Sequence, residues 1–505
     1  MSTVTVHHSN VTVDDATVTS PSSPFITEPS NVSIAGGGIV GLVLALALIQ
    51  QGVCDNNSSE ASENNKSTII HVFEQAPEFQ DDVGAGMGLY PNGLRVIRDI
   101  SPKLLEQLQQ AGCPYQSRTW MRHDGTQVAS ADETVLARMS KFDDIDPDLQ
   151  PIGIRRWKLQ KILLEAAVEA GVEIHFGKRL QTIKESSDSV VQMRFEDGST
   201  HETKLLLAAD GAKSMVRSIV TGGACELKYT GTTCLMGTSA TPRSDQGLML
   251  PSSPTTKCHG AFYPTSQEEQ CFQFHFPTCT EKLDKATSTV AVGGWGGMTQ
   301  TMTHAECQEL ATQLYDQGWD EERFVQPLQN VQKALRIGLT TLDPPLEKFT
   351  FDRIVLVGDA AHPPVPFLGQ GAQQGLEDAG TLALLLKQFC VTDNSEFSLD
   401  HVQHALQIYN ELRVPRTHDV VERGKLAGQQ QQKRAENAKY NRVREEKIKR
   451  EVFYNENSSH LFPGVRHDYK QAVDAALIEY RQHCVAEEKI REQKEHRLIC
   501  VPEED

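Results

Sequence analysis

Three glycines near the start of the chain, Gly36, Gly38 and Gly41, have the spacing G-x-G-x-x-G. An apolar run at residues 32–35 precedes them and an alanine- and leucine-rich run at residues 42–49 follows, which predicts a strand, a tight turn and a helix. Gly36 would allow the turn, Gly38 would let the backbone approach a pyrophosphate, and Gly41 would let helix and strand pack closely. The spacing predicts dinucleotide binding at a helix N-terminus, and the alternative is a glycine-rich turn in an ordinary α/β protein.

Glu74 ends the next apolar run, residues 68–74, which we expect to be the second strand. In a dinucleotide-binding fold an acid at this point accepts a hydrogen bond from a ribose hydroxyl, usually about 20 residues after the glycines. The separation is longer here because a polar surface segment, residues 52–67, is inserted before the strand. Glu74 is therefore the predicted ribose ligand, and the alternative is a solvated acid at a strand end.

Two further glycines and an arginine have positions that suit a large anionic ligand. Gly86 and Gly88 precede a predicted helix at residues 94–110 and would let the backbone run close to a flat group, although a plain loop is the alternative. Arg156 lies in the first turn of another predicted helix, where a cation opposes the helix dipole. An anionic ligand explains this arginine better than helix stability does, and a surface ion pair is the other interpretation.

Two acids follow apolar runs of the kind found in strands that are buried on both faces. Asp210 comes directly after the run at residues 204–209, and Asp359 follows the run at residues 353–357. The second run leads through a loop into a predicted helix at residues 373–388. This late loop ends with small residues, among them Gly369, Gly371 and Ala372.

The composition excludes several classes of protein. The 67 acidic residues outnumber the 49 basic ones, and the resulting net charge of −18 argues against nucleic acid as a partner. The 11 cysteines include no C-x-x-C pair, which argues against a zinc site and a disulfide framework and favours a reducing compartment, here the cytoplasm. The sequence shows no signal peptide and no apolar run long enough to cross a bilayer of ~30 Å, so we expect no transmembrane segment.

Three segments in this order resemble the FAD-dependent aromatic monooxygenases with the p-hydroxybenzoate hydroxylase fold, over roughly residues 32–425. They are the glycine loop with Glu74, the motif Ala-Asp-Gly-x-x-Ser-x-Val-Arg that contains Asp210, and Gly-Asp-Ala-Ala-His-Pro around Asp359 with its later Gly-Gln-Gly. The run from Gly86 to Gly93 and the pair Arg156 and Leu159 are similar to the fungal salicylate-hydroxylase-like branch.

The resemblance implies a role for each of these residues. The glycines of the first loop would hold the pyrophosphate of FAD, Glu74 would bind the adenosine ribose, and Arg156 would reach the phosphates. Gly86 and Gly88 would line the cofactor. Asp210 lies in a motif associated with both FAD and NAD(P)H, and Asp359 would bind the ribityl chain or the phosphates. The isoalloxazine ring would pass beside the late loop: Pro364, Pro366, Gly369, Gly371 and Ala372.

The resemblance also implies an α/β fold in which a Rossmann-type FAD-binding domain carries an inserted β-rich substrate domain and C-terminal helices. We expect the FAD-binding domain at residues 31–110, 151–220 and 346–425. The substrate domain would then comprise residues 111–150 and 221–345. A disordered tail would precede them at residues 1–30, and a charged helical region would follow at residues 426–505.

The implied activity is the insertion of one oxygen atom from O2 into a phenolic or related secondary-metabolite substrate, with NADPH or NADH as reductant, through a C4a-hydroperoxyflavin. The alternatives are an FAD-dependent epoxidase or a reductase or dehydrogenase on the same fold. A plain NAD-binding protein or a degenerate flavin module is a third possibility, against which the intact glycines, Glu74 and Asp359 argue. No metal is required and none is suggested by residue spacing, and self-association through the C-terminal region is a further hypothesis.

The substrate-activating residue is not evident. Many members of the family carry an arginine after Tyr-x-Gly in a strand of the substrate domain, whereas this chain has Met236 there. Tyr263 and His259 are the candidate catalytic residues, with His275 as a third, because a base or hydrogen-bond acceptor would favour the phenolate. A packed strand residue is the alternative for each, and His362 is expected to have a structural role in its turn.

Overall fold

The structure of this chain is a computed structural model. It describes residues 29–53, 69–114, 117–132, 149–185, 190–241, 247–253, 257–277, 299–391, 397–433, 442–443, 445–446, 448 and 467–499. The predicted tail up to residue 28 and most of the predicted polar insertion lie outside these residues. Within the described ranges, no helix is long and apolar enough to cross a membrane.

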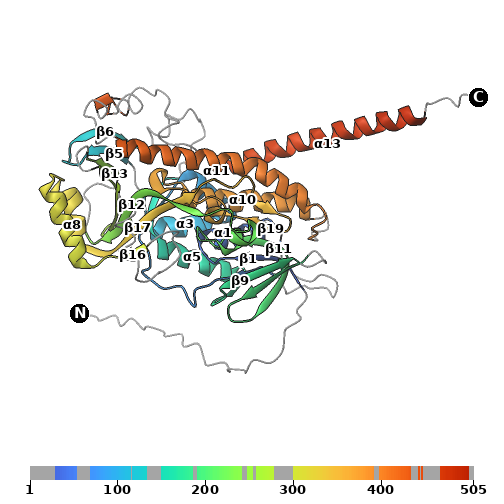
Figure 1. Ribbon diagram of the computed structural model, residues 1–505, viewed down its shortest axis with the longest axis horizontal. Coiled ribbons are helices and arrows are strands. Elements are labelled where there is room, and N and C mark those ends of the chain that lie inside the picture. The colour runs from blue at the N-terminus through green and yellow to red at the C-terminus, as the bar shows by residue number, and fades with distance from the viewer. Residues whose placement is uncertain are drawn as a thin grey trace, which may run out of the picture.

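The first layer is an eight-stranded sheet with the order β18-β19-β11-β1-β2-β8, and β10 and β9 extend it from β11 (Figure 1). Five of these strands run parallel, as expected for apolar runs that are covered on both faces. The strands are β1 (Ser30–Ala35), β2 (His71–Phe73), β8 (Glu173–His175), β9 (Leu180–Glu185), β10 (Val191–Phe195), β11 (Thr200–Ala208), β18 (Thr350–Phe351) and β19 (Ile354–Leu356).

Helices cover this sheet and give it a continuous core. Helix α1 (Ile39–Gln50) is buried along almost its whole length because it packs against both α5 (Arg156–Glu169) and α10 (Gly371–Cys390). The predicted strand–turn–helix units at the first glycine loop and at Asp359 are therefore confirmed, and their helices α1 and α10 lie in contact.

The second layer is an antiparallel-rich sheet with the order β16-β17-β12-β15-β14-β13-β5-β6 (Figure 1). Its strands are β5 (Ser117–Arg122), β6 (Gln127–Asp132), β12 (Leu227–Ser239), β13 (Leu248–Ser252), β14 (His259–Pro264), β15 (Gln270–Pro277), β16 (Thr299–Thr301) and β17 (Val331–Leu342). Helix α8 (His304–Asp316) closes one side together with η2 (Glu321–Val325) and α9 (Gln326–Gln329). An aromatic core fills the space between: Phe262, Phe272, Phe274, Trp319 and Phe324.

A small third sheet joins the two layers. It has the order β3 (Gly86–Leu89), β7 (Ile152–Arg155) and β4 (Cys113–Pro114). A Cβ atom at Gly153 would overlap the carbonyl oxygen of Pro264, so β7 lies directly against β14 of the second layer. The close approach holds the small sheet directly against the second layer.

The prediction of a single helix over residues 94–110 was wrong. The structure has two helices, α2 (Pro91–Ile100) and α3 (Pro102–Ala111), separated by an extended Ser101. Pro102 disfavours the helical conformation at the residue before it. The Ser101 hydroxyl then caps α3 by accepting a hydrogen bond from Leu104 N at 3.3 Å.

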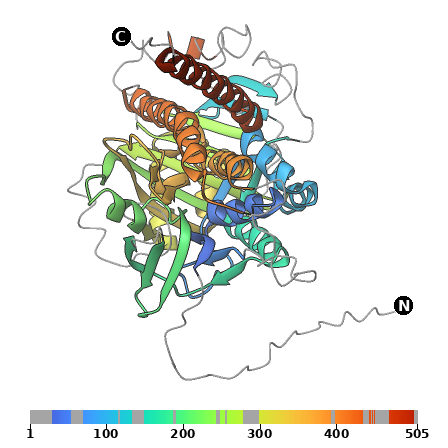
Figure 2. The ribbon, with the colours of Figure 1, turned by 90° about the vertical axis from the view of Figure 1, so that its right-hand side faces the viewer.

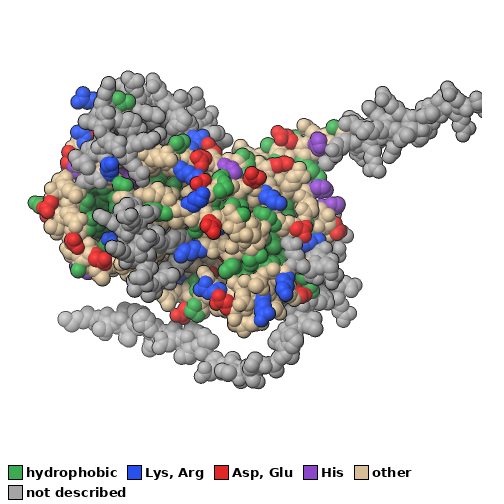
Figure 3. Space-filling view, in the orientation of Figure 1, with side chains coloured by type: hydrophobic (Ala, Val, Ile, Leu, Met, Phe, Trp, Pro, Cys, Tyr) green, Lys and Arg blue, Asp and Glu red, His purple; other side chains and the backbone are tan. Residues whose placement is uncertain are grey.

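Two long helices form the C-terminal part, α11 (Val402–Lys433) and α13 (Tyr469–Ile499). Figures 1 and 2 show α11 lying across the upper side of the molecule and α13 extending away from it. The charged helix predicted at about residues 422–451 begins inside α11, and much of its second half lies outside the described residues. On the face in Figure 3, acidic and basic side chains are interspersed, which suits a strongly charged surface without one dominant patch.

Candidate active site

A cavity of about 1180 Å³ lies between the first and second sheets. Its volume exceeds the ~300–1,000 Å³ of ordinary ligand pockets, which leaves space for a large cofactor and a substrate together. Gly41 is the one predicted site residue that does not line it. The others all do: Gly36, Gly38, Glu74, Gly86, Gly88, Arg156, Asp210, His259, Tyr263, Asp359, Gly369, Gly371 and Ala372.

The first glycine loop turns sharply between β1 and α1. Gly36 has φ of +102°, and its N–H donates to Phe73 O at 2.8 Å. Cβ atoms at Gly36 and Gly41 would overlap backbone oxygens of Ala209 and Gly36, respectively. A Cβ atom at Gly38, by contrast, would meet no atom within 4 Å. Packing therefore explains the first and third glycines, whereas the open space beside Gly38 suits a ligand at the N-terminus of α1.

Glu74 connects the second strand to this loop. Its Oε2 accepts a hydrogen bond from Gly37 N at 2.8 Å, and its Oε1 accepts one from Ala76 N at 2.8 Å. A carboxylate has further acceptor positions, which leaves Glu74 able to accept from a ribose hydroxyl in the cavity.

Arg156 begins α5 and faces the same space. Burial lowers its pKa, while the negative charges of Glu74 and Asp359 act in the opposite direction. The neighbouring Arg155 belongs to β7 instead and pairs with Asp82 and Glu269. Ion pairing thus explains Arg155, whereas Arg156 supplies a positive charge to the cavity.

Asp210 and Asp359 lie at the ends of adjacent strands, β11 and β19. Asp210 Oδ2 accepts from Val216 N at 3.1 Å, but its buried Oδ1 has no hydrogen-bond partner among the residues that the structure describes. Burial raises the pKa of both carboxyl groups. Arg217 fixes the two loops together by donating to Ala212 O at 2.6 Å and Ala360 O at 2.8 Å. An unsatisfied buried acceptor in a cavity suits a ligand with hydroxyl or amide donors.

The second sheet presents alternate side chains to the cavity, as the two-residue period of strands requires. His259 and His275 are directly opposite each other on β14 and β15, and Met236 and Tyr263 lie on the same face. The residues between them, such as Phe262, point the other way into the aromatic core. Strand register therefore decides which side chains a substrate would meet.

Tyr263 and the two histidines form the polar part of this wall. Gln273 Nε2 donates to the Tyr263 hydroxyl at 3.2 Å. The His259 and His275 rings are stacked with centroids 4.7 Å apart, and both lie against Phe367. His275 is 3% exposed, and burial lowers its pKa to about 4, so its ring is neutral at pH 7.

Arg118 is a cavity residue that the sequence did not reveal. It lies on β5, is 8% exposed, and its guanidinium is 5.5 Å from the centre of the Tyr90 ring. Trp120, two residues later on the same face, also lines the cavity. This cation comes from residues 111–150, far in sequence from Met236, where the resemblance leads one to look for an arginine. No local motif marks it.

Comparison with known proteins agrees with this geometry. The FAD binding domain family matches residues 29–423, most of the chain. The chain is 27% identical to FAD-dependent monooxygenase SAT7 of Stachybotrys chartarum (79% of this chain, 82% of the relative). It is 27% identical to 3-amino-4-hydroxybenzoate 2-monooxygenase of Streptomyces cremeus (78% and 86%). The chain belongs to the FAD-dependent aromatic monooxygenases.

Solved structures share the fold of this monooxygenase. CtdE in complex with FAD and a substrate superposes with a TM-score of 0.67 at 19% identity, covering 90% of this chain and all of that one. Klebsiella pneumoniae HpxO with FAD and uric acid gives a TM-score of 0.63 at 20% identity, covering 88% and 97%. The family and the fold inferred from the three motifs are thus confirmed, and FAD is the cofactor.

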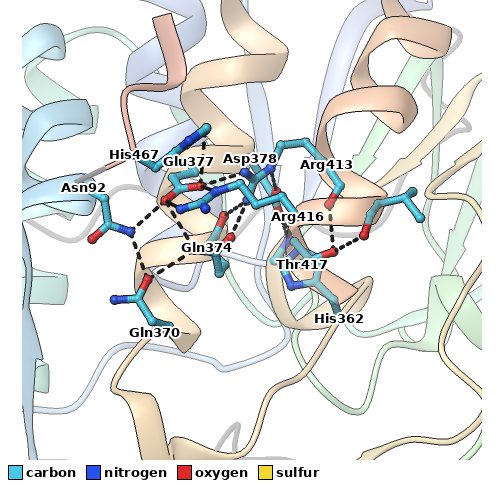
Figure 4. A network of polar contacts seen from close by, with 12 residues as sticks. Asn92, His362, Gln370, Gln374, Glu377, Asp378, Arg413, Arg416, Thr417 and His467 are labelled. Carbon is cyan, nitrogen blue, oxygen red and sulfur yellow. Dashed lines mark hydrogen bonds and ion pairs between the residues drawn. The ribbon is translucent and has the colours of Figure 1, made fainter. Parts of the chain in front are cut away.

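In this monooxygenase a buried network of ion pairs and hydrogen bonds connects the late loop, which begins at Gly358, to α10 and α11 (Figure 4). Asp378 on α10 accepts from Gly358 N at 2.8 Å, lies 2.6 Å from His362 Nε2, and accepts from Arg413 Nε at 2.6 Å. Gly358 directly precedes Asp359. The position of His362 agrees with the structural role expected for it, because it joins its own turn to α10.

Glu377 is the second acid of this network and is completely buried. Arg413 NH1 donates to it at 2.7 Å, Asn92 Nδ2 donates at 2.7 Å, and Arg416 pairs with both of its oxygens (Figure 4). Burial alone would raise the pKa of Glu377, but the arginines lower it to about 2. No prediction from the sequence included this network, although the adjacent acids Glu377 and Asp378 within an alanine- and leucine-rich helix were a signal of it.

Proposed function

We propose that this monooxygenase uses NAD(P)H and O2 to insert one oxygen atom into a phenolic compound that carries an acidic group. The observation that carries the proposal is Arg118, a nearly buried cation that shares one cavity with the residues of the cofactor side. A buried guanidinium favours a carboxylate, with which it can form two parallel hydrogen bonds.

The rest of the substrate wall suits an aromatic ring with a hydroxyl group. Trp120, Met236 and Ile337 supply apolar surface, and Tyr263, His259 and the neutral His275 supply hydrogen-bonding groups. A nearby acceptor would withdraw the phenolic proton and enrich the ring in electrons. Relatives act on aromatic acids by name: one is 6-methylsalicylate 1-monooxygenase of Aspergillus terreus, 26% identical over 77% of this chain and 80% of the relative.

On the opposite wall, the proposed FAD contacts follow the strand ends. The loop at Gly36 and Gly38 would bind the pyrophosphate together with Arg156, Glu74 would bind the adenosine ribose, and Asp359 the ribityl chain. The N-terminus of α10 at Gly371 and Ala372 would stabilise negative charge on the ring system. The bound flavin supplies the electron transfer and oxygen activation, and the chain positions the substrate and excludes water.

One set of measurements tests the proposal. The purified protein is examined for a flavin spectrum, and NADPH and NADH oxidation, O2 consumption and ¹⁸O incorporation are followed with hydroxybenzoates and the matching neutral phenols. We expect stoichiometric flavin and oxygenated hydroxybenzoate. Absence of flavin would overturn the assignment, and substrate-stimulated NAD(P)H oxidation without labelled product would favour the reductase alternative. Epoxidation of an alkene would favour the epoxidase, and a preference for neutral phenols would contradict the role of Arg118.

A further inference from the structure

Three potential metal ligands lie side by side at the edge of the first sheet, away from the active-site cavity. His71 on β2 is directly opposite Glu173 on β8, and His175 follows Glu173 by two residues. Since alternate residues of a strand point to the same face, all three side chains lie on one face of the sheet. Their ligand atoms lie within 4.8 Å of one another.

The separations between these atoms match a tetrahedral ligand set. His71 Nδ1 is 3.1 Å from His175 Nε2 and 3.3 Å from Glu173 Oε2, and His175 Nε2 is 3.8 Å from that same oxygen. Zinc bonds to nitrogen and oxygen are ~2.0–2.2 Å long, so ligand atoms in a tetrahedral site lie about 3.3–3.5 Å apart. A single ion can therefore contact all three atoms without a change of strand register.

Hydrogen bonding alone explains the cluster less well. His71 Nδ1 lies close to both His175 Nε2 and Glu173 Oε2, and whichever ring carries the shared proton, one proton on His71 Nδ1 can be donated well to only one of the two atoms. A cation between the three ligand atoms would instead accept a lone pair from each of them.

We propose that His71, Glu173 and His175 bind one divalent zinc ion per chain. Two imidazoles and a carboxylate are zinc ligands, whereas Mg²⁺ and Ca²⁺ prefer oxygen donors alone. The Glu173 side chain is 50% exposed, so water can reach the site and supply a fourth ligand.

The surroundings define the site further. His201 is adjacent to His71, with ring centroids 5.0 Å apart, but its Nε2 contacts the hydroxyls of Ser30 and Ser33 at 3.0 Å. The positive charge of Lys178 is also close to His175, and the Lys178 ammonium group pairs with Asp197 at 2.6 Å. His201 is therefore engaged by the two serines and lies beside the cluster without being one of the proposed ligands.

A bound ion would connect β2 and β8 just before Glu74. Glu74 follows the end of β2, and its N–H donates to His175 O at 2.9 Å. The zinc site would therefore stabilise the strand ends beside the first glycine loop. This inference rests on the strand pairing and on the ligand atoms, and it does not depend on the proposed substrate.

The test is zinc binding to the flavin-loaded enzyme after treatment with a chelator that is then removed. Calorimetric titration with zinc chloride should show one tight equivalent per chain, and Co²⁺ in its place should give the visible bands of a tetrahedral complex. His71→Gln, His175→Gln and Glu173→Gln should each weaken binding more than ~100-fold. Two control variants should bind zinc as the wild type does. Glu196→Gln removes one negative charge, as Glu173→Gln does, but at an exposed residue outside the cluster, and His201→Gln removes a neighbouring imidazole that is not a proposed ligand.

Unchanged flavin content in each variant shows that the chain is folded, so loss of zinc can be assigned to the ligands. Failure of the wild type to bind a stoichiometric equivalent would overturn the proposal. Wild-type affinity in His71→Gln and His175→Gln would do so as well, because zinc would then be bound at other surface groups.

Discussion

The wall of the cavity that we propose binds FAD consists of strand ends and turns, whereas the opposite wall is the face of a sheet. On the first wall, backbone groups and a few acids lie where β1, β11 and β19 end. On the second, side chains such as Met236 and His275 project from the middle of long strands. A change on the first wall therefore alters the backbone or a buried acid. A change on the second alters one of the side chains that a substrate would meet, most of which are apolar or aromatic and one of which is the cation Arg118.

The first wall also has a support that the second lacks. A buried ionic network connects the late loop to α10 and α11. It includes Arg413, Glu377 and Asp378, whose side chains are at most 1% exposed. The substrate wall is backed by apolar aromatic packing instead. We expect substitutions on the cofactor side to lower stability or flavin content, and substitutions on the substrate side to change the binding and turnover of substrate while stability and flavin content stay as in the wild type.

The largest effect is expected from the glycine loop. Gly41→Ala should prevent accumulation of folded protein, because its Cβ would overlap the carbonyl oxygen of Gly36. Gly38→Ala should fold, since no atom lies within 4 Å of its Cβ, but should bind FAD more weakly because the methyl group occupies the cofactor's space. Soluble yield, circular dichroism and flavin content distinguish the two. Equal flavin content in Gly38→Ala and the wild type would contradict a close approach of FAD to this loop.

The ionic network should come next. Arg413→Met removes the buried arginine that Glu377 and Asp378 share, which costs about 3–5 kcal/mol of unfolding free energy. Arg423→Met is the matched control, because its pair with Asp419 is partly exposed and worth about 0.3–0.5 kcal/mol. Urea unfolding measures both. A similar small loss in the two variants would show that the network does not stabilise the cofactor wall.

The same network predicts how stability depends on pH. The pKa of Glu377 is about 2 in the folded chain against an ordinary 4.5, so its contribution is present above about pH 4.5 and is lost as the pH falls toward 2. Burial lowers the pKa of His275 and His467 to about 4, which adds a separate loss between about pH 6.5 and 4. Thermal unfolding across this range should show both losses, and in Arg413→Met the first loss should shrink, because Glu377 then keeps its pair with Arg416 but not the one with Arg413. An identical acid profile in that variant would exclude Glu377 as the source.

A smaller change is expected from Asp359, the acid that we propose lies beside the flavin. Asp359→Ala should weaken FAD binding about 10- to 100-fold, the range for loss of a hydrogen bond to a charged group. Flavin fluorescence during titration of the apoenzyme measures the affinity, and the exposed Asp400→Ala serves as the control. Stoichiometric FAD of wild-type affinity in Asp359→Ala would contradict the placement of the cofactor.

The difference between the two walls explains which cavity residues could be predicted from the sequence. Gly36, Glu74 and Asp359 were recognisable because each occupies a fixed place relative to a strand end, and local spacing encodes that place. Arg118 and the zinc ligands were not, because strand pairing joins segments that are about 100 residues apart. Pro102 marks the break between α2 and α3, whereas the prediction of a single helix followed the periodicity of the apolar residues.

The substrate wall should give the smallest and most selective effect. Arg118→Met should raise the KM for hydroxybenzoates about tenfold, because a charge-assisted hydrogen bond is lost, while the KM for neutral phenols and the flavin content stay as in the wild type. Arg122→Met is the matched control on the same strand, since Arg122 is exposed and pairs with Glu445 at 2.7 Å. Steady-state oxygen consumption gives both constants. An equal rise in KM for charged and neutral substrates would mean that Arg118 acts through packing on Tyr90 and not through its charge.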